Sequence, residues 1–327
     1  MWQDVQARQI LRDQFVAAVA RVLDEGWAEQ LPPMPVFTTT DGCRLAYDDT
    51  VASSPANAPV VLFLHGWSAS RRYFCRNVPQ LQATCRVICL DMRFHGESDS
   101  PAHGMHIARL AADVRELVLG LNLDKSKLTL IGTSMGCAVI WSFVELFGSA
   151  SVRQAIFVDQ LPLQNRREDW PLHGYGCYDE ASLQGIEHTL ATDLPAIAQG
   201  NLDSCLVRDD VPRDILDILR ADVLQCKPTA LATLMRDHTQ IDWRPLLPTI
   251  SIPCLNLLGG PKNKVFPMAG ALVVGDTIPN CTNVVFERCG HWLYLEQPND
   301  FCQLVQAFVH DRPLPVSSSN GLVVYNK

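Results

Sequence analysis

The residues best suited to chemistry lie in the segment Gly132-Thr133-Ser134-Met135-Gly136. An apolar run, Leu128–Ile131, precedes this G-x-S-x-G pattern, and a helix-like stretch beginning at Val139 follows it. A sharp turn from strand to helix strains the serine backbone and exposes its hydroxyl, and the flanking glycines leave room where the backbone passes too close for a Cβ. The Met135 N–H, at the start of the helix, can then donate to a developing oxyanion. The segment therefore predicts a nucleophilic serine, Ser134.

A second segment, His65-Gly66-Trp67, directly follows the apolar run Val60–Leu64. Gly66 allows the chain to turn beneath a substrate, and the Trp67 N–H can supply a second oxyanion donor beside that of Met135. His65 precedes the glycine, and we interpret it as a structural hydrogen-bonding residue. The prediction is an oxyanion hole made by the Trp67 and Met135 N–H groups.

A histidine follows the last apolar run of the core. Cys289-Gly290-His291-Trp292 comes after Asn283–Phe286, and Gln297-Pro298 then begins a helical segment. A histidine on a loop that contains glycine can reach the serine at the sheet edge and accept its proton. We therefore predict His291 as the general base.

The elements that must position these residues alternate along the chain. A hairpin is expected across Asp41-Gly42, and helical segments separate the apolar runs that follow it. Continuous apolar strands with intervening helices indicate a parallel sheet covered on both faces. The fold class is therefore α/β, with a mostly parallel, doubly wound sheet. The expected strands are Val60–Leu64, Val87–Leu90, Leu128–Ile131, Ala155–Val158, Cys254–Leu258 and Asn283–Phe286.

The long gap in this alternation predicts an inserted helical cap over residues 163–247, after the sixth strand and above the carboxyl ends of the sheet. The core then comprises residues 36–162 and 248–312. Residues 1–35 are expected to form an amphipathic helix and a proline-rich linker. Residues 313–327 are expected to be a flexible tail.

Composition restricts the possible partners. The 327 residues carry a formal net charge of -8, which argues against a nucleic-acid or anionic-membrane partner. Several of the 12 cysteines lie inside apolar runs, and the chain has no C-x-x-C pair, so we expect free thiols and no metal site. No signal peptide or membrane span is recognised. We therefore expect a cytoplasmic protein.

Four motifs together resemble the α/β-hydrolase superfamily over about residues 36–312: His65-Gly-Trp, Asp91-Met-Arg-Phe-His-Gly-Glu-Ser98, Gly132-Thr-Ser-Met-Gly136 and Gly290-His291. The resemblance implies that fold, with Ser134 on its nucleophile elbow. It also implies structural roles for Asp91, Arg93 and His95, in a turn where Phe94 replaces the more usual glycine.

The resemblance leaves the third member of the triad open. Most of the superfamily carries an acid after the seventh strand, where this chain has Asn263 within Gly260–Pro267. Asp159 follows the sixth strand directly, and certain lactonases and cofactor-free quinolone dioxygenases carry their acid at that place. The alternative is that Asp159 only caps a helix of the cap. We predict Asp159 as the acid, because Asn263 cannot supply a charge to stabilise the imidazolium.

Aromatic residues of the cap and its surroundings predict a pocket for a hydrophobic small molecule. The predicted substrate-binding residues are Trp170, Tyr175, Trp243 and Trp292. The cap histidines His173, His188 and His238 are expected at the surface.

These residues favour a serine hydrolase that cleaves a carboxylic ester or lactone through an acyl-enzyme, without a cofactor. Two alternatives remain: hydrolysis of a carbon–carbon bond in a β-diketone by the same triad, and a cofactor-free dioxygenase using His291 and Asp159. A non-catalytic ligand receptor is a third. The cap or the N-terminal helix is a candidate contact for a homodimer.

Overall fold

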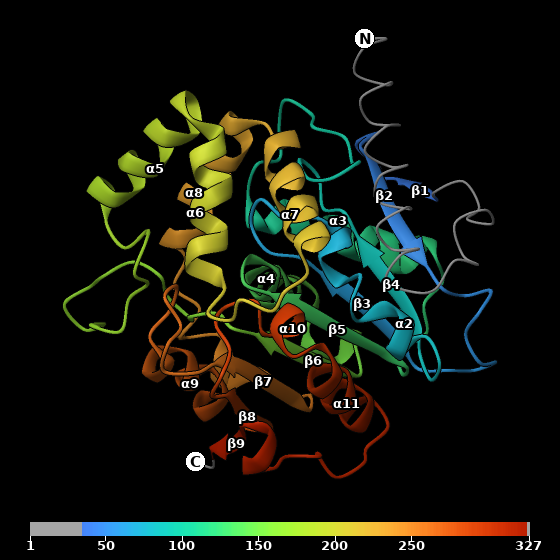
Figure 1. Cartoon of the computed structure of the whole chain (residues 1–327). Coiled ribbons are helices and arrows are strands. Elements are labelled where there is room, and N and C mark those ends of the chain that lie inside the picture. Colours follow the sequence, from blue (N-terminus) through green and yellow to red (C-terminus); the bar gives the residue numbers. More distant parts are fainter. Residues whose placement is uncertain (1–34, 326–327) are drawn as a thin grey trace.

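The computed structural model describes residues 35–325, which form a nine-stranded sheet in the order β1-β2-β4-β3-β5-β6-β7-β8-β9 (Figure 1). The helix predicted within residues 1–35 falls almost wholly outside the described residues. The strands are β1 (Val36–Thr38), β2 (Arg44–Asp49), β3 (Val60–Leu64), β4 (Arg86–Leu90), β5 (Leu128–Thr133), β6 (Gln154–Val158), β7 (Cys254–Gly259), β8 (Cys281–Phe286) and β9 (Leu322–Tyr325).

The central strands of the sheet, β4, β3, β5, β6, β7 and β8, pair in parallel, while β1, β2 and β9 pair antiparallel at the two edges. Parallel strands need a crossover between them, which the intervening helices provide. The predicted fold class, a mostly parallel α/β sheet with helices inserted after the sixth strand, is confirmed.

Alternate residues of the strands enter two separate cores, because successive side chains of a strand point to opposite faces. In β3, for example, Leu62 and Leu64 belong to one core and Val61 and Phe63 to the other. The first face is covered by α3 (Ile107–Gly120), α4 (Met135–Phe147) and α9 (Met268–Thr277). The other is covered by α2 (Val78–Leu81), the short α10 (Leu293–Glu296) and α11 (Pro298–Val309).

Four helices between β6 and β7 form the cap: α5 (Glu180–Thr192), α6 (Leu194–Cys205), α7 (Arg213–Gln225) and α8 (Pro228–Gln240). Figure 1 shows them grouped together at one end of the sheet. Apolar residues of α6 and α7 join the core on one face of the sheet, and those of α8 join the core on the other face. The cap is thus packed on the sheet from both sides.

Buried polar contacts fasten the cap to the segment that follows β3. Asp222 of α7 accepts a hydrogen bond from the Ser70 hydroxyl at 2.5 Å and pairs with the Arg72 guanidinium. The indole nitrogen of Trp67 donates to the Leu231 carbonyl of α8 at 2.9 Å. Buried ion pairs that lose one partner are costly, so these contacts favour one fixed position of the cap.

The carboxyl-terminal residues correct one expectation from the sequence. Residues 313–327 were predicted as a flexible tail, but Leu322–Tyr325 form β9 and pair antiparallel with β8. The prediction is wrong for these residues, because Leu322 is buried in the core and the strand completes the hydrogen bonds of the β8 edge.

Candidate active site

Ser134 lies between the end of β5 and the start of α4, in a backbone conformation that side chains rarely adopt, with φ 52° and ψ -122°. Its N–H donates to the Val158 carbonyl of the neighbouring strand at 2.9 Å, which holds the turn against β6. A positive φ at a residue other than glycine costs on the order of 1–3 kcal/mol and marks functional sites disproportionately. The strained elbow predicted from the sequence is therefore present.

Two glycines make this turn possible. A Cβ on Gly132 would lie 2.4 Å from the Gly136 carbonyl oxygen, and one on Gly136 would lie 2.2 Å from the Leu64 carbonyl oxygen. Contacts this short with backbone atoms are essentially never seen for real Cβ atoms. Any larger residue at either position would force β5, α4 and β3 apart.

Asp159 and His291 meet at the carboxyl end of the sheet, where the Nδ1 atom of His291 lies 2.5 Å from the Oδ2 atom of Asp159. Asp159 is fully buried and, like Ser134, has a positive φ, 49°. Because Nδ1 donates to the carboxylate, the other ring nitrogen of His291, Nε2, can accept a proton. The structure thus places the predicted acid directly against the predicted base.

Asn263 contacts the acid instead of the histidine. Its Nδ2 atom lies 3.0 Å and 2.9 Å from the two carboxylate oxygens of Asp159, and its Oδ1 atom accepts the Val265 N–H at 3.0 Å. The Gly259 N–H donates to the same carboxylate at 2.9 Å. Asn263 therefore supports Asp159 from the position where most of the superfamily carries the acid, which the sequence did not reveal.

Ser134 and His291 line one cavity of about 170 Å³, between the end of the sheet and the cap. Its volume is smaller than the roughly 300–1,000 Å³ of typical small-molecule pockets. Much of its wall is apolar, and no Lys, Arg, Asp or Glu is among the residues that form it. The apolar part of the wall comes from Trp67, Ala69, Ile186, Met235, Val265, Phe266 and Trp292.

The loop that carries His291 is held by the buried carboxylate of Glu296. This carboxylate accepts the N–H groups of Gly290 at 2.6 Å, Val207 at 2.8 Å and Arg208 at 2.7 Å. Burial raises the pKa of Glu296 above its ordinary value, although the three donors oppose that shift. Glu296 thus joins the segment between α6 and α7 to the backbone beside His291.

The region predicted as an oxyanion hole lies beside the serine. A Cβ on Gly66 would stand 3.2 Å from the Cβ of Ser134, so the chain that leads to Trp67 passes close to the nucleophile. Met135 is the first residue of α4, where N–H groups lack partners within the helix. Both N–H donors are thus brought to the vicinity of Ser134.

The residues assigned structural roles are buried beneath this region. His65 receives the Met92 N–H at Nε2, and its Nδ1 atom contacts the Gly66 carbonyl at 2.8 Å. His95 receives the Ser68 N–H at 3.2 Å. Burial lowers the pKa of both histidines, that of His95 to about 3. Both rings are therefore neutral hydrogen-bonding groups that shape the loop after β3.

Comparison with known proteins agrees with this fold. Residues 59–175 match the family model described as "alpha/beta hydrolase fold". The structure also superposes on an esterase from Exiguobacterium antarcticum with a TM-score of 0.77 and 23% identity, over 85% of this chain and 99% of that one. The chain has the α/β-hydrolase fold.

Two further proteins are similar to this chain over much of their length. The monoacylglycerol lipase ABHD6 of Mus musculus is 26% identical over 261 residues, which cover 78% of this chain and 76% of the mouse protein. The enol-lactonase of Burkholderia xenovorans superposes with a TM-score of 0.71 and 19% identity, over 84% of this chain and all of that one. Identities this low leave the substrate to be argued from the site.

Three of the four predicted substrate-binding residues lie outside the cavity wall. The indole of Trp170 is buried and donates to the Leu163 carbonyl at 2.8 Å, Trp243 packs against Trp141, and Tyr175 is 54% exposed. Only Trp292 lines the cavity. Local sequence patterns could not predict the direction of each aromatic side chain, because that direction depends on tertiary packing.

One cap histidine was also misplaced from the sequence. His238 was expected at the surface, but it is 3% exposed and lines the cavity. No role at the site was predicted for Gln160 or Gln164, although both follow Asp159 closely in the chain. The helical spacing of His238 with the buried Leu231, Leu234 and Met235 of α8 was the available signal.

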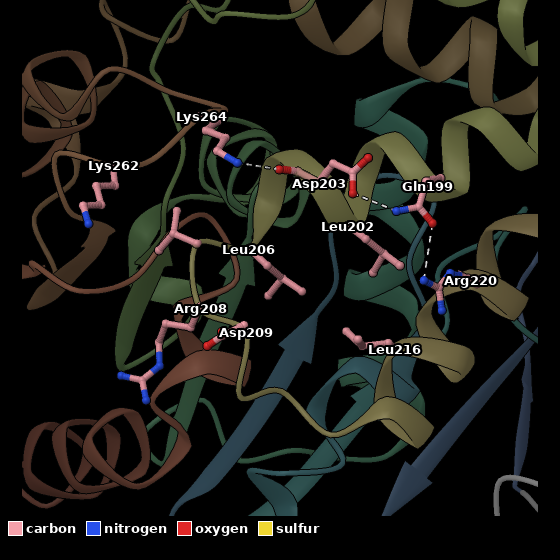
Figure 2. A pocket seen from close by; sticks show the side chains of 11 residues that line it. Gln199, Leu202, Asp203, Leu206, Arg208, Asp209, Leu216, Arg220, Lys262 and Lys264 are labelled. Carbon is pink, nitrogen blue, oxygen red and sulfur yellow. Dashed lines mark hydrogen bonds between the residues drawn. The ribbon is translucent and has the colours of Figure 1, made fainter.

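A larger groove, of about 760 Å³, lies on the outer surface between α6, α7 and the loop after β7 (Figure 2). Lys264 donates to the Asp203 carbonyl, and Gln199 bridges the Asp203 carboxylate and Arg220. Neither Ser134 nor His291 lines this groove, so we assign the active site to the smaller cavity.

Within residues 35–325, no three His, Cys, Asp or Glu side chains are grouped so that they could hold a metal ion. All twelve cysteines lie in this range and are free thiols. The same range contains no helix that is both long and apolar enough to cross a membrane.

Proposed function

We propose that the protein is a serine hydrolase that cleaves a small carboxylic ester or lactone. The observation that carries the proposal is the cavity into which Ser134, on its strained elbow, and His291, held by Asp159, are brought together. The esterase, lipase and lactonase named among the similar proteins support the same class of reaction.

In the proposed reaction, the Ser134 hydroxyl attacks the carbonyl carbon while the Nε2 atom of His291 takes its proton. The buried carboxylate of Asp159 stabilises the imidazolium that forms. The Trp67 and Met135 N–H groups donate to the oxyanion, and His291 returns the proton to the leaving alkoxide. Water activated by His291 then releases the acid from the acyl-enzyme and restores the serine.

The size of the cavity limits the substrate. A volume of about 170 Å³ is well below that of pockets for drug-sized ligands, so a short acyl or alcohol group is expected under the cap. The apolar wall favours an uncharged substrate, because no side chain there offers an opposite charge to offset the desolvation of an ion.

Hydrolysis of p-nitrophenyl acetate, butyrate and decanoate tests the proposal, with the Ser134→Ala variant as the control. Wild-type turnover that falls steeply from butyrate to decanoate, and is lost in Ser134→Ala, is expected. Turnover that persists in Ser134→Ala would contradict the proposed nucleophile.

A cofactor-free dioxygenase would also use the His291–Asp159 pair, so oxygen consumption must be measured separately. The strained backbone at Ser134 favours the hydrolase, because a reaction on the His–Asp pair alone gains nothing from an exposed serine hydroxyl. Oxygen uptake with a hydroxyquinolone that is unchanged in Ser134→Ala, without ester cleavage, would favour the dioxygenase instead.

A further inference from the structure

A buried pair of polar side chains joins the core to the cap beside the active site. Gln160 directly follows Asp159, and its Nε2 atom lies 2.9 Å from the Nε2 atom of His238 on α8. The two residues are 1% and 3% exposed. Burial of polar groups is costly unless their atoms find hydrogen-bond partners. The polar atoms of these two side chains that lack a partner therefore indicate where a ligand could bind.

The hydrogen on the His238 ring follows from this contact. In this orientation of the Gln160 amide, its nitrogen donates to the Nε2 atom of His238, which places the hydrogen of the neutral ring on Nδ1. Burial keeps the ring neutral by lowering its pKa to about 3. Among the described residues, that Nδ1 atom is buried without a hydrogen-bond partner.

An unpartnered acceptor lines the same cavity. The Oε1 atom of Gln164 is buried without a partner in the described structure, and Gln164 and His238 both line the cavity that holds Ser134. Other polar residues of the wall are already engaged: Asn201 donates to the Ser68 hydroxyl at 3.0 Å, and Ser204 to the Gly200 carbonyl at 2.6 Å.

We propose that His238 and Gln164 form a subsite for a hydroxyl group of the substrate, with Gln160 as the residue that positions the His238 ring. A hydroxyl accepts one hydrogen bond and donates another, which matches the Nδ1–H donor and the Oε1 acceptor. The proposal rests on the proposed hydrolase function, and it narrows the substrate to a short ester or lactone that carries an uncharged hydroxyl.

The residues that line the cavity disfavour charged ligands and plain alkyl chains. A carboxylate or an ammonium group would be buried without a counter-charge, since no Lys, Arg, Asp or Glu is in the wall. A plain alkyl chain would leave the His238 donor and the Gln164 acceptor unpaired. A site built to bond a substrate hydroxyl rejects the analogue that lacks it much more strongly than an apolar pocket rejects a methylene.

The test compares esters that differ by one hydroxyl, with kcat/KM measured by pH-stat. One pair places the hydroxyl on the acyl side, methyl 3-hydroxybutanoate against methyl butanoate. The other places it on the alcohol side, 2-hydroxyethyl butanoate against propyl butanoate. We expect a preference of tenfold or more for the hydroxylated ester in one pair, which also identifies the side that lies under the cap.

Three variants connect that preference to the subsite. His238→Phe and Gln164→Met should each reduce it to less than threefold, and Gln160→Met should weaken it through the loss of ring orientation. His188→Phe, which changes an exposed cap histidine, should leave it unchanged. Labelling of Ser134 by a small fluorophosphonate at the wild-type rate shows that a variant is folded and its nucleophile intact.

Two results would overturn the subsite. One is equal kcat/KM for both members of both pairs in the wild type. The other is a preference that survives in both His238→Phe and Gln164→Met while Ser134 still reacts. Absence of cleavage for all four esters, together with no labelling of Ser134, would instead refute the proposed hydrolase function.

Discussion

Asp159 and Asn263 stand at the ends of two neighbouring strands, and their side chains are within hydrogen-bond distance of one another. A carboxylate at both positions would place two negative charges about 3 Å apart, where both cannot remain ionised. An amide at position 263 is therefore the natural companion of an acid at position 159. The amide at position 263 thus avoids a second negative charge beside Asp159.

Replacement of Asp159 tests its role as the acid. Asp159→Asn should lower kcat/KM for a small ester by about 10³–10⁴-fold, because the imidazolium loses its counter-charge and the ring its preferred tautomer. Asn263→Ala should cost only about tenfold, since it removes hydrogen bonds to the carboxylate without removing the charge. Equal losses in the two variants would assign both residues the same importance and contradict this division of roles.

A second carboxylate, introduced at position 263, should change the pH dependence. Asn263→Asp should move the acid limb of the kcat/KM profile to higher pH, because each carboxylate disfavours ionisation of the other. The profile of Asn263→Ala, which adds no charge, is the control. An acid limb at the same pH in Asn263→Asp and the wild type would show that the two side chains do not interact.

The sequence predicted Ser134, His291 and Asp159 because each follows a strand within a recognisable local pattern. It could not predict that Asn263 supports Asp159, because that contact depends on how two loops meet. It also failed for Trp170, Trp243 and His238. The directions of the two tryptophan side chains depend on tertiary packing and not on local spacing, whereas the helical spacing of His238 was a signal of its burial.

At the scale of elements, the loop before α10 depends on one carboxylate. Glu296 accepts three backbone N–H groups, two from the cap segment and one beside His291. It therefore links the position of the base to that of the cap.

Most strands could be predicted from the sequence because buried parallel strands form continuous apolar runs. β9 could not be, since it follows a serine-rich stretch that resembles a tail.

Glu296→Ala should leave three N–H groups without their acceptor, which costs on the order of 1–3 kcal/mol for each buried donor. We expect a lower midpoint of urea unfolding and a lower kcat/KM, with Glu296→Gln intermediate because it keeps one acceptor oxygen. Glu168→Ala, which changes an exposed glutamate, is the control for removal of a carboxylate. Wild-type stability in Glu296→Ala would show that water replaces the carboxylate freely.

At the scale of the whole molecule, burial of neutral histidines makes stability depend on pH. Burial lowers the pKa of His95 and of His238 to about 3, against about 6.5 in the unfolded chain. Between these values the unfolded state binds more protons than the folded one. The free energy of unfolding therefore has its full value above about pH 6.5 and falls as the pH decreases toward 3.

Each of these histidines should reduce the free energy of unfolding by about 2 kcal/mol between pH 7 and pH 5. Urea unfolding of the wild type and of His238→Gln at both pH values measures the contribution of His238, because the other titrating groups are common to both proteins. The loss on acidification should be about 2 kcal/mol smaller in His238→Gln. The same loss in both proteins would mean that His238 is protonated in the folded state.

The fold as a whole brings residues that follow β5, β6 and β8 to one place under the cap, where we propose that they act as one triad. The most direct measurement is the rate at which a small fluorophosphonate labels the protein, with the modified residue mapped by peptide mass spectrometry. We predict label on Ser134 alone, at a rate about 10³-fold or more lower in Asp159→Asn. Label on another residue, or an unchanged rate in Asp159→Asn, would contradict the proposed triad.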